Sequence, residues 1–395
     1  MQDNTNHDKP FISIIMPVYN NAKLLSNAVQ SVFNQSFENW ELIIIDDGST
    51  DDTPAVADAF AVCDRRIRVI HQENQWIYKS INNGYAAALG EYALVVNSDD
   101  TINPDALKEI YKVAVIDRAD LVVFNLWYRG CNGNQEIIDP DLNGCRKWLE
   151  EPFSLSDCEE IHKIWPKLVE KSLVNHQCVY RKSIYKVYTY PNQYYADDIL
   201  YNQIIADYVH VIAGTPYCVY NSYFYSDRKM NASIGKYYGY EHNMFNAIYL
   251  GNMRLFEKWG VLNIEAENII TAIRLRGLTN EIHSYSSYQC SLTMEEKVKK
   301  IIEGATDPIV YNSALDTGKL SEWERRIISG LWDVLDGQRL DRNSKYYFIQ
   351  ELLDGIYNFD KGKEGKEKIR SAVFHRNNQY HIGIWFMNKF GVEKL

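Results

Sequence analysis

Residues 11–53 read FISIIMPVYNNAKLLSNAVQSVFNQSFENWELIIIDDGSTDDT, and this stretch decides the fold. It opens on Phe11–Met16, a β-branched apolar run that predicts a buried strand. The apolar residues of 24–32 then recur at the spacing of one helix face. Trp40–Ile45 is a second continuous apolar run, which predicts a second buried strand. The stretch therefore predicts a β-α-β unit.

The same alternation continues to residue 126. Further strands are predicted at Ile67–His71, Tyr92–Val96 and Leu121–Leu126, and further helices begin at Thr53-Pro54, near Ser80 and at Asn103-Pro104. A capping hydroxyl or amide followed by proline is typical of a helix start. Continuous apolar strands alternating with helices predict an α/β fold, with a mostly parallel sheet covered by helices on both faces.

The pattern of residues 126–395 predicts that the chain has two domains. Residues 126–235 mix short apolar runs with Gly, Pro and Asn, and we expect them to complete a first domain over 1–235. Helical periodicity dominates from about Tyr240, with capping boxes at Thr293…Glu296 and Ser321…Glu324. A mainly helical second domain is therefore expected over 236–395.

Composition excludes several protein classes. The chain has 395 residues, of which 46% are hydrophobic and 24% charged, so it is not mainly disordered. Its net charge of −10 argues against a general nucleic-acid binder. Residues 1–10 lack an apolar core, and no run approaches the ~20 apolar residues of a membrane span, so we expect a cytoplasmic protein. The seven cysteines form no Cys-x-x-Cys pair, which favours buried free thiols over zinc.

Three polar segments follow the first, second and fourth predicted strands. They are Met16–Asn20 (MPVYN), Asp46–Asp51 (DDGSTD) and Asn97–Asp100 (NSDD). Carboxyl ends of parallel strands share one crevice, where ligands bind. Clustered carboxylates repel unless a cation lies among them, and Mg²⁺ or Mn²⁺ also bridges to phosphates. The pattern predicts a nucleotide-diphosphate–metal site. Taken alone, Asp46–Asp51 is explained about as well by a turn and helix cap, and Asp99-Asp100 by a helix cap before Asn103-Pro104.

Together with Asn82-Asn83-Gly84 and Gly90-Glu91-Tyr92, these segments resemble glycosyltransferase family 2, whose members are inverting enzymes with the Rossmann-like GT-A fold. The resemblance covers about residues 11–125. It implies that Pro17, Val18 and Tyr19 line the base, that Asp47 contacts uracil, and that Asp99 and Asp100 hold the ribose and the metal–diphosphate, with Mn²⁺ or Mg²⁺ as cofactor. Asn82 and Lys79 are also assigned to the donor site. Asn97 stands where the family often has an acid, and Ile81 where it often has a basic residue, whose charge Lys79 is suggested to supply.

A looser resemblance continues downstream. Tyr195–Asn202 (YADDILYN) is similar to the family's acidic pair before a helix, which places Asp198 at the catalytic-base position and Asp197 where Glu is usual. The resemblance also assigns Arg228 to the loop over the donor phosphates. An exposed helix N-cap is the alternative for the acid pair. For His176 a hydrogen-bonded core histidine is the preferred interpretation.

The resemblance implies transfer of a hexose-type sugar from a UDP-sugar to a hydroxyl of a glycan or lipid-linked saccharide, in bacterial surface-polysaccharide synthesis such as capsule or lipopolysaccharide. Two alternatives stay open. A non-catalytic sugar-nucleotide or glycan-binding protein would also fit the altered acid motif. A nucleotidyltransferase is disfavoured, because residues 17–21 carry no glycine-rich phosphate loop.

Two compositional features lead to further expectations. Residues 361–395 hold eight Lys/Arg, three Glu and several aromatic residues. This composition would suit docking on the anionic inner face of the cytoplasmic membrane. A packed terminal helix with solvated lysines is preferred, and acceptor binding or homo-oligomerisation are other roles for this domain. The 29 tyrosines concentrate in 180–240, which predicts an aromatic acceptor groove there.

Overall fold

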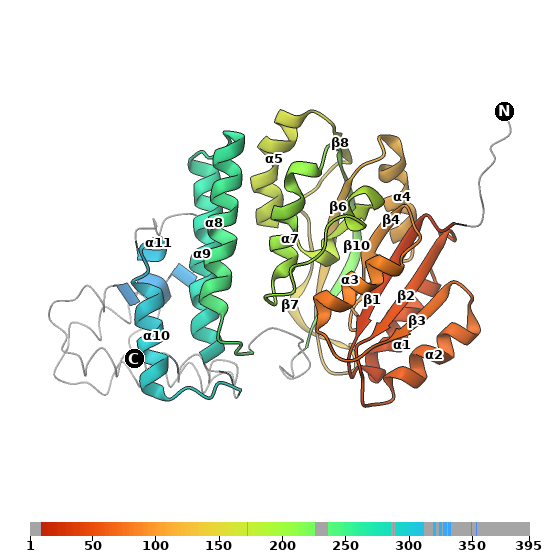
Figure 1. Ribbon diagram of the computed structural model, residues 1–395, viewed down its shortest axis with the longest axis horizontal. Coiled ribbons are helices and arrows are strands. Elements are labelled where there is room, and N and C mark those ends of the chain that lie inside the picture. Colours follow the sequence, from red (N-terminus) through yellow and green to blue (C-terminus); the bar gives the residue numbers. More distant parts are fainter. Residues whose placement is uncertain are drawn as a thin grey trace. The chain divides into compact units, whose positions relative to one another are not determined.

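The computed structural model describes residues 9–171, 173–225, 236–285, 287, 289–311 and scattered positions between 319 and 353. The chain divides into two compact units, Met1–Ala232 and Ser233–Leu395 (Figure 1). Arg228, Ser321 of the second capping box and the basic segment 361–395 lie outside the described residues. The expectations attached to them stay predictions.

The first unit is built on one large sheet. Its strands run in the order β3 (Ile67–His71), β2 (Trp40–Asp46), β1 (Ile12–Val18), β4 (Tyr92–Val95), β9 (Cys178–Arg181), β6 (Leu121–Cys131), β10 (Ile212–Tyr225) and β5 (Thr101–Ile102), with β7 (Ile137–Arg146) paired to β6 and β8 (Phe153–Leu155) paired to β10. The pairs β3–β2, β2–β1, β1–β4 and β6–β10 are parallel, while β9 is antiparallel to both of its neighbours. The predicted mostly parallel α/β sheet is confirmed.

Helices cover the sheet on both faces, as the continuous apolar strands require (Figure 1). The helices α1 (Ala22–Phe33), α2 (Thr53–Cys63) and α4 (Ala106–Ile116) share one apolar core with the β1 residues Ile12, Ile14 and Met16. Ile15, which lies between Ile14 and Met16 in β1, faces α3 (Ile77–Ala87) instead. A Cβ on Gly84 of α3 would lie 2.4 Å from Ile15 Cγ2, so glycine allows this close approach.

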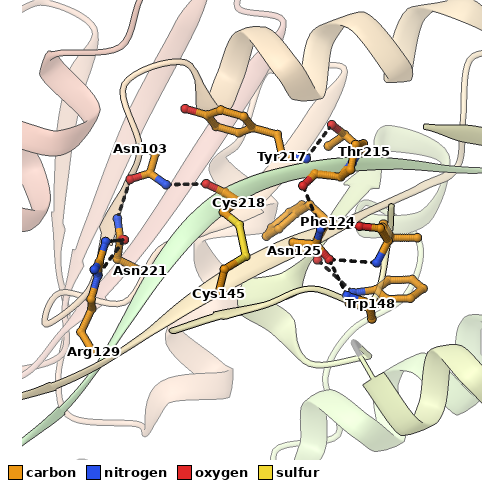
Figure 2. The surroundings of a disulfide bond; sticks show 12 residues. Asn103, Phe124, Asn125, Arg129, Cys145, Trp148, Thr215, Tyr217, Cys218 and Asn221 are labelled. Carbon is orange, nitrogen blue, oxygen red and sulfur yellow. Dashed lines mark hydrogen bonds between the residues drawn. A yellow bond between two sulfur atoms is a disulfide. The ribbon is translucent and has the colours of Figure 1, made fainter. Parts of the chain in front are cut away.

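The predicted capping role of Asn103 is wrong. Helix α4 begins later, at Ala106, after a turn. The Asn103 side chain instead bonds to β10, where its amide donates to the Cys218 carbonyl and its Oδ1 accepts from Asn221 Nδ2 at 3.0 Å (Figure 2). This amide therefore fastens the loop after β4 to β10, a strand more than a hundred residues further along the chain.

The order of the strands creates a crevice. The chain runs from β1 to β2 and β3 on one side, then returns to β4 on the other side of β1. Ligands bind at such a switch point in open α/β sheets. The downstream helices of this unit are α5 (Cys158–Lys171), α6 (Lys182–Tyr185) and α7 (Asp197–Ile205), with single turns η1 (Asn175–Gln177) and η2 (Ala206–Tyr208).

The expectation that all cysteines are free thiols is wrong for one pair. Cys145 of β7 and Cys218 of β10 form a disulfide, with their Cα atoms 6.9 Å apart (Figure 2). Both strands flank β6, and irregular register in β10 on either side of Cys218 accompanies the pairing. The two cysteines are 73 residues apart and carry no spacing motif, so only the folded sheet reveals that they meet.

Reduction of this disulfide is expected to destabilise the first unit. Closing a loop of 73 residues removes conformational freedom from the unfolded chain, by about 4 kcal/mol on the chain-entropy account. Urea unfolding with and without dithiothreitol measures the difference. The variant Cys145→Ser/Cys218→Ser should show no response to the reductant, and Cys63→Ser, which changes an exposed free thiol, should keep the full response. Equal midpoints for the oxidised and reduced wild type would contradict the prediction.

The described part of the second unit is helical. It contains α8 (Glu241–Trp259), α9 (Ile264–Tyr285), α10 (Met294–Ala305) and the short α11 (Pro308–Tyr311). The predicted capping box at Thr293 and Glu296 starts α10, with both reciprocal hydrogen bonds present. Within the described residues no helix has the length and apolar character needed to cross a membrane.

Candidate functional site

The loops after β1, β2 and β4 lie together at the carboxyl edge of the sheet, as predicted. The backbone N–H of Asp47 donates to the Val18 carbonyl at 2.9 Å, and the N–H of Asn20 donates to Ser49 Oγ at 2.9 Å. Asn21 Nδ2 then reaches Ser98 Oγ at 3.0 Å. These bonds join all three polar segments into one surface.

Asp47 is the acid of the second segment that bonds to the loop after β3. It is only 4% exposed, and its Oδ1 accepts from Gln72 Nε2 at 2.7 Å and from the Gln75 N–H at 2.8 Å. The neighbouring Gly48 has φ +75°, and a Cβ there would lie 2.9 Å from the Asn74 nitrogen. Glycine is therefore needed for the loop after β2 to pack against the loop after β3.

The two flanking acids have structural roles. Asp46 Oδ2 lies 2.8 Å from His71 Nδ1, and this hydrogen bond is the main cause that raises the pKa of His71. Asp51 accepts from the N–H groups of Ala22 and Thr53 at 3.2 and 3.0 Å. The turn-and-cap interpretation therefore holds for Asp46 and Asp51, while Asp47 is left as the candidate for ligand recognition.

Asp100 is held in place from three directions. Its carboxylate accepts from Tyr220 Oη at 2.8 Å, from the Tyr223 N–H at 2.8 Å and from Asn97 Nδ2 at 3.2 Å. Burial raises its pKa well above the usual value, and the negative charge of Asp99 adds to the shift. Burial also raises the pKa of Asp99 to about 6. Two adjacent carboxylates in such surroundings favour a bound cation or a shared proton.

Asn97 explains how the site accommodates the missing acid. Its Nδ2 donates to Asp100, so the amide relieves the crowding of negative charge that a third carboxylate would add. Its Oδ1 is buried and has no hydrogen-bond partner in the described structure. An orphaned oxygen beside two carboxylates matches the hard oxygen ligands that Mg²⁺ and Mn²⁺ prefer. The described residues contain no ready-made cluster of three or more His, Cys, Asp or Glu groups for a metal.

Strand β10 supplies the supports of the acid pair. Besides Tyr220 and Tyr223, it contributes Tyr225, whose hydroxyl donates to the Asp99 carbonyl at 2.8 Å. The sequence analysis did not identify Tyr220. No local pattern indicates that this buried phenol, 120 residues from Asp100, donates to it.

Asp197 and Asp198 begin α7 but have different surroundings. Asp197 accepts from the N–H groups of Gln193 and Tyr194 at 2.5 and 3.0 Å, so its carboxylate closes the loop before the helix. Asp198 accepts from Tyr78 Oη at 3.1 Å and from the Asn175 N–H at 3.2 Å. Burial raises the pKa of Asp198 to about 6. Asp198 is therefore a carboxylate poised to exchange a proton near neutral pH.

The tyrosines around Asp198 do not form the expected groove. Tyr180, Tyr185, Tyr190 and Tyr201 are all buried. Tyr190 and Tyr201 stack with ring centroids 4.2 Å apart, and Tyr180 meets Tyr201 edge-on at 5.2 Å. The prediction of an acceptor groove is wrong for these residues, because composition does not show which face of an element a ring occupies. They form an aromatic core that supports the start of α7.

His176 connects the surroundings of the two acids. Its neighbour Asn175 binds Asp198, and its own ring packs on Tyr220, with ring centroids 5.2 Å apart. Burial lowers the pKa of His176 to about 4, so the ring is neutral at physiological pH. Together with its hydrogen bond to Asn175 Oδ1 at 3.1 Å, this agrees with a core histidine. Asp198 and Asp100 are thus joined through Asn175, His176 and Tyr220.

The other assigned residues vary in their surroundings. Pro17 and Val18 are buried at the end of β1, while Tyr19 is 52% exposed beside them. Lys79 is exposed on α3. Asn82 makes two hydrogen bonds with the Tyr190 backbone, at 2.9 and 3.0 Å, which tie α3 to the loop before α7. The donor contacts of Asn82 and Lys79 stay predictions.

Two residues of the loop and helix after β3 escaped the sequence analysis. Tyr78 is buried, and its hydroxyl lies close enough to donate to the Tyr195 carbonyl at 2.6 Å as well as to Asp198. Trp76 is 63% exposed and has φ +74° and ψ 159°, a conformation that only glycine adopts without strain of about 1–3 kcal/mol. Helical periodicity marks Tyr78 only as a core residue, and no pattern in one sequence indicates the strained backbone of Trp76.

The acid limb of the pH–rate profile is expected to report Asp198. A base with a pKa of about 6 loses its charge below that pH, so transfer should fall about tenfold per pH unit there. Tyr78→Phe removes a donor that stabilises the carboxylate, and the limb should move upward by about one pH unit. Rates at saturating donor and Mn²⁺ test this. The pKa of Asp99 is also about 6, so UDP affinity is measured at each pH. This separates an effect of Asp99 on donor binding from the effect of Asp198 on transfer. Tyr85→Phe is the control, because the Tyr85 hydroxyl contacts Tyr190 and not Asp198. If the acid limb does not move in Tyr78→Phe, the assignment of that limb to Asp198 is refuted.

Comparison with known proteins agrees with this geometry. The model of the family described as "Glycosyl transferase family 2" matches residues 13–189, which hold the three loops and the acid pair of β4. The match spans 177 of the 395 residues, so the likeness to family 2 is a likeness of this segment. Glycosyltransferase GlyG of Streptococcus pneumoniae is 38% identical over 125 residues, 31% of this chain and 42% of GlyG. Glycosyltransferase GlyA of the same organism is 35% identical over 116 residues, 29% of this chain and 17% of GlyA. These matches span less than half of either relative.

A solved structure extends the likeness of the family 2 domain to the fold. Residues 1–349 of S. aureus TarS, crystallised with UDP-GlcNAc, superpose with a TM-score of 0.56 at 18% identity. The alignment covers 89% of this chain and 92% of that one. The expected GT-A architecture is therefore confirmed, together with a C-terminal helical region. At 18% identity, this likeness shows the fold.

Proposed function

We propose that the protein is an inverting glycosyltransferase that moves a hexose-type sugar from a UDP-sugar to a hydroxyl of a saccharide acceptor. The observation that carries the proposal is Asp198, a buried carboxylate with a pKa raised to about 6 and joined by packed residues to the acid pair after β4. The TarS structure with UDP-GlcNAc supports a uridine nucleotide as the donor type.

The donor would bind across the carboxyl edge of the sheet. Asp47 accepts hydrogen bonds at the base end, while Asp99 and Asp100 lie at the diphosphate end. The orphaned Asn97 Oδ1 and these two carboxylates would hold the metal. When bound, Mn²⁺ or Mg²⁺ neutralises the negative charge that builds on the departing diphosphate.

Asp198 would accept the proton of the acceptor hydroxyl as that oxygen attacks the anomeric carbon. The Tyr78 hydroxyl and the Asn175 N–H fix both oxygens of the carboxylate. A single displacement with the diphosphate leaving from the opposite face inverts the anomeric centre, so no covalent enzyme intermediate is needed. A positioned general base contributes about 10²–10⁴-fold to the rate.

A panel of donors tests this proposal. UDP-glucose, UDP-galactose, UDP-N-acetylglucosamine, UDP-N-acetylgalactosamine and UDP-glucuronate are incubated with the protein and Mn²⁺, and released UDP is measured. Release from at least one donor is expected, and it should depend on Asp198. Binding of UDP without release from any donor would instead favour the alternative, a non-catalytic sugar-nucleotide-binding protein.

We further propose that the acceptor is a glycan or lipid-linked saccharide of the cell surface, as in capsule or lipopolysaccharide. The named relatives GlyG and GlyA, both glycosyltransferases of a bacterium, support a bacterial saccharide product. Membrane contact through 361–395, acceptor binding by the helical unit, homo-oligomerisation and cytoplasmic location are held as predictions within this proposal.

A further inference from the structure

The disulfide lies beside the segment of β10 that supports the acid pair after β4. Cys218 is two residues before Tyr220, whose hydroxyl donates to Asp100 Oδ2 at 2.8 Å. The Cys218 carbonyl accepts from the side-chain amide of Asn103, which lies in the loop after β4 (Figure 2). The backbone N–H of Asn103 donates to the Val219 carbonyl at 2.9 Å. This segment of β10 is therefore bonded directly to the chain that carries the acid pair.

The same segment is the irregular part of β10. Its pairing with β6 shifts register between Thr215 and Cys218 and again between Cys218 and Tyr220. Extra residues at such shifts disrupt the ladder, so hydrogen bonds to β6 hold this stretch less firmly than a regular strand. The bond to Cys145 of β7 is a covalent tie at this point. Its loss is therefore expected to loosen the part of β10 that positions Tyr220.

Strand β7 reaches the acid pair by a second route. It forms a hairpin with β6, and Gln135 lies in the turn between the two strands. Gln135 Nε2 donates to the Asp99 carbonyl at 3.0 Å and to Tyr225 Oη at 3.0 Å. The loop that carries the acid pair is thus held both by β10 and by the turn of this hairpin. The disulfide joins these two supports to each other.

The position of the disulfide leaves it open to small molecules. Cys145 and Cys218 are half-buried, whereas the free thiols Cys131 and Cys178 are buried. A disulfide that a small thiol can reach exchanges with it. If the protein is cytoplasmic, as the sequence predicts, its surroundings favour reduction, and the disulfides that do form there are mostly transient or redox-sensing.

We propose that the Cys145–Cys218 disulfide is a redox switch that sets how tightly the acid pair after β4 binds its cation. This inference rests on the proposed function, which assigns the cation to Asp99 and Asp100. In the oxidised protein, β10 and the hairpin hold the acid pair as one joined support. In the reduced protein the two supports move separately, and the cation is bound more weakly.

The switch works by thiol–disulfide exchange. The thiolate of a low-molecular-weight thiol attacks one sulfur of the protein disulfide and forms a mixed disulfide, while the other cysteine leaves as a thiolate. A second small thiolate attacks the small-molecule sulfur and releases the remaining cysteine. The products are two protein thiols and one small-molecule disulfide, so two electrons and two protons pass from the small thiols to the protein. Oxidation by a small-molecule disulfide is the reverse reaction.

The test compares the oxidised and reduced full chain in the background Cys63→Ser/Cys158→Ser, which removes the two exposed free thiols. Excess reductant is removed without air, Mn²⁺ affinity is measured from the electron paramagnetic resonance signal of the free ion, and UDP affinity by calorimetry. Reduction should weaken Mn²⁺ binding at least about fivefold, which corresponds to the loss of one supporting hydrogen bond. UDP binding without Mn²⁺ should be unchanged.

Hydrogen exchange distinguishes a loosened support from general unfolding. On reduction, residues 97–103 and 218–225 should exchange faster, while residues 40–46 of β2 keep their protection. Further addition of Cys145→Ser/Cys218→Ser to this background gives a form that should behave like the reduced protein and should not respond to thiols.

Three results would overturn the switch. They are equal Mn²⁺ affinity in the oxidised and reduced forms, a uniform loss of protection across the sheet, and no Mn²⁺ binding by either form. The donor panel decides the proposed function separately. If the oxidised protein releases UDP from a donor, the proposed function stands even when the switch fails, and if it releases none, the proposed function itself has failed.

Discussion

Asp198→Asn is expected to reduce sugar transfer by about 10²–10⁴-fold while UDP affinity stays close to that of the wild type. The amide keeps the size of the carboxylate. With its oxygen toward the Asn175 N–H, its NH2 group can donate to Tyr78 Oη, whose own proton can go to the Tyr195 carbonyl, so the start of α7 should remain folded. What it loses is the ability to take the proton of the acceptor hydroxyl. The effect should fall on kcat, because the donor binds at the other end of the site.

Two controls make this result specific. Asp117→Asn removes an exposed carboxylate at the end of α4 and should leave transfer unchanged. Asp197→Asn should mainly lower stability, because the Asp197 carboxylate holds the Gln193 and Tyr194 N–H groups of the preceding loop. If Asp198→Asn transfers sugar at close to the wild-type rate, or if Asp197→Asn and Asp198→Asn lose kcat equally, the base is another residue.

Asp99→Asn is expected to abolish most of the gain in UDP affinity that Mn²⁺ provides. A metal contact to the diphosphate is worth several kcal/mol, so the loss should be on the order of 10²-fold or more in the presence of Mn²⁺. Without the metal, the variant and the wild type should bind UDP alike, because the base end of the site is unchanged. Calorimetric titration of UDP with and without Mn²⁺ provides both comparisons.

Asp100→Asn gives a contrasting pattern for the same site. Asp100 holds Tyr220 Oη and the Tyr223 N–H in addition to any ligand, so its replacement should weaken metal-dependent binding and also lower the unfolding temperature. Asp99 carries its hydrogen bonds to Tyr225 and Gln135 through its backbone carbonyl, which the substitution leaves intact. A Mn²⁺-dependent gain that survives in Asp99→Asn would remove Asp99 from the metal site.

The sheet could be predicted because its strands bury both faces. Ile67–His71 agrees residue for residue, and Phe11–Met16 and Trp40–Ile45 agree within two residues at each end. Because the carboxyl ends of parallel strands lie at one edge of a sheet, the placement of the loops that carry Asp47, Asp99 and Asp100 at that edge followed from topology. The antiparallel strand β9 could not be predicted in this way, because its pairing joins residues far apart in the chain.

A single sequence does not reveal which residues hydrogen-bond to the candidate acids and hold them in place. Tyr78 and Asp198 are 120 residues apart, as are Tyr220 and Asp100. Each pair is a single contact between a buried phenol and a carboxylate, and neither carries a periodic pattern or a motif. The same limit explains the tyrosine error: the count of rings was informative, but whether a ring faces the core or a ligand depends on partners from other elements.

Strand β10 has one more consequence. The Tyr220 hydroxyl and the Tyr223 N–H donate to the Asp100 carboxylate, and the Tyr225 hydroxyl donates to the Asp99 carbonyl. Cys218, on the same strand, is covalently joined to β7. If the acid pair holds a metal as proposed, its cation preference is expected to change on substitution of Tyr220, with both acids left untouched. Tyr220→Phe is the simplest such change.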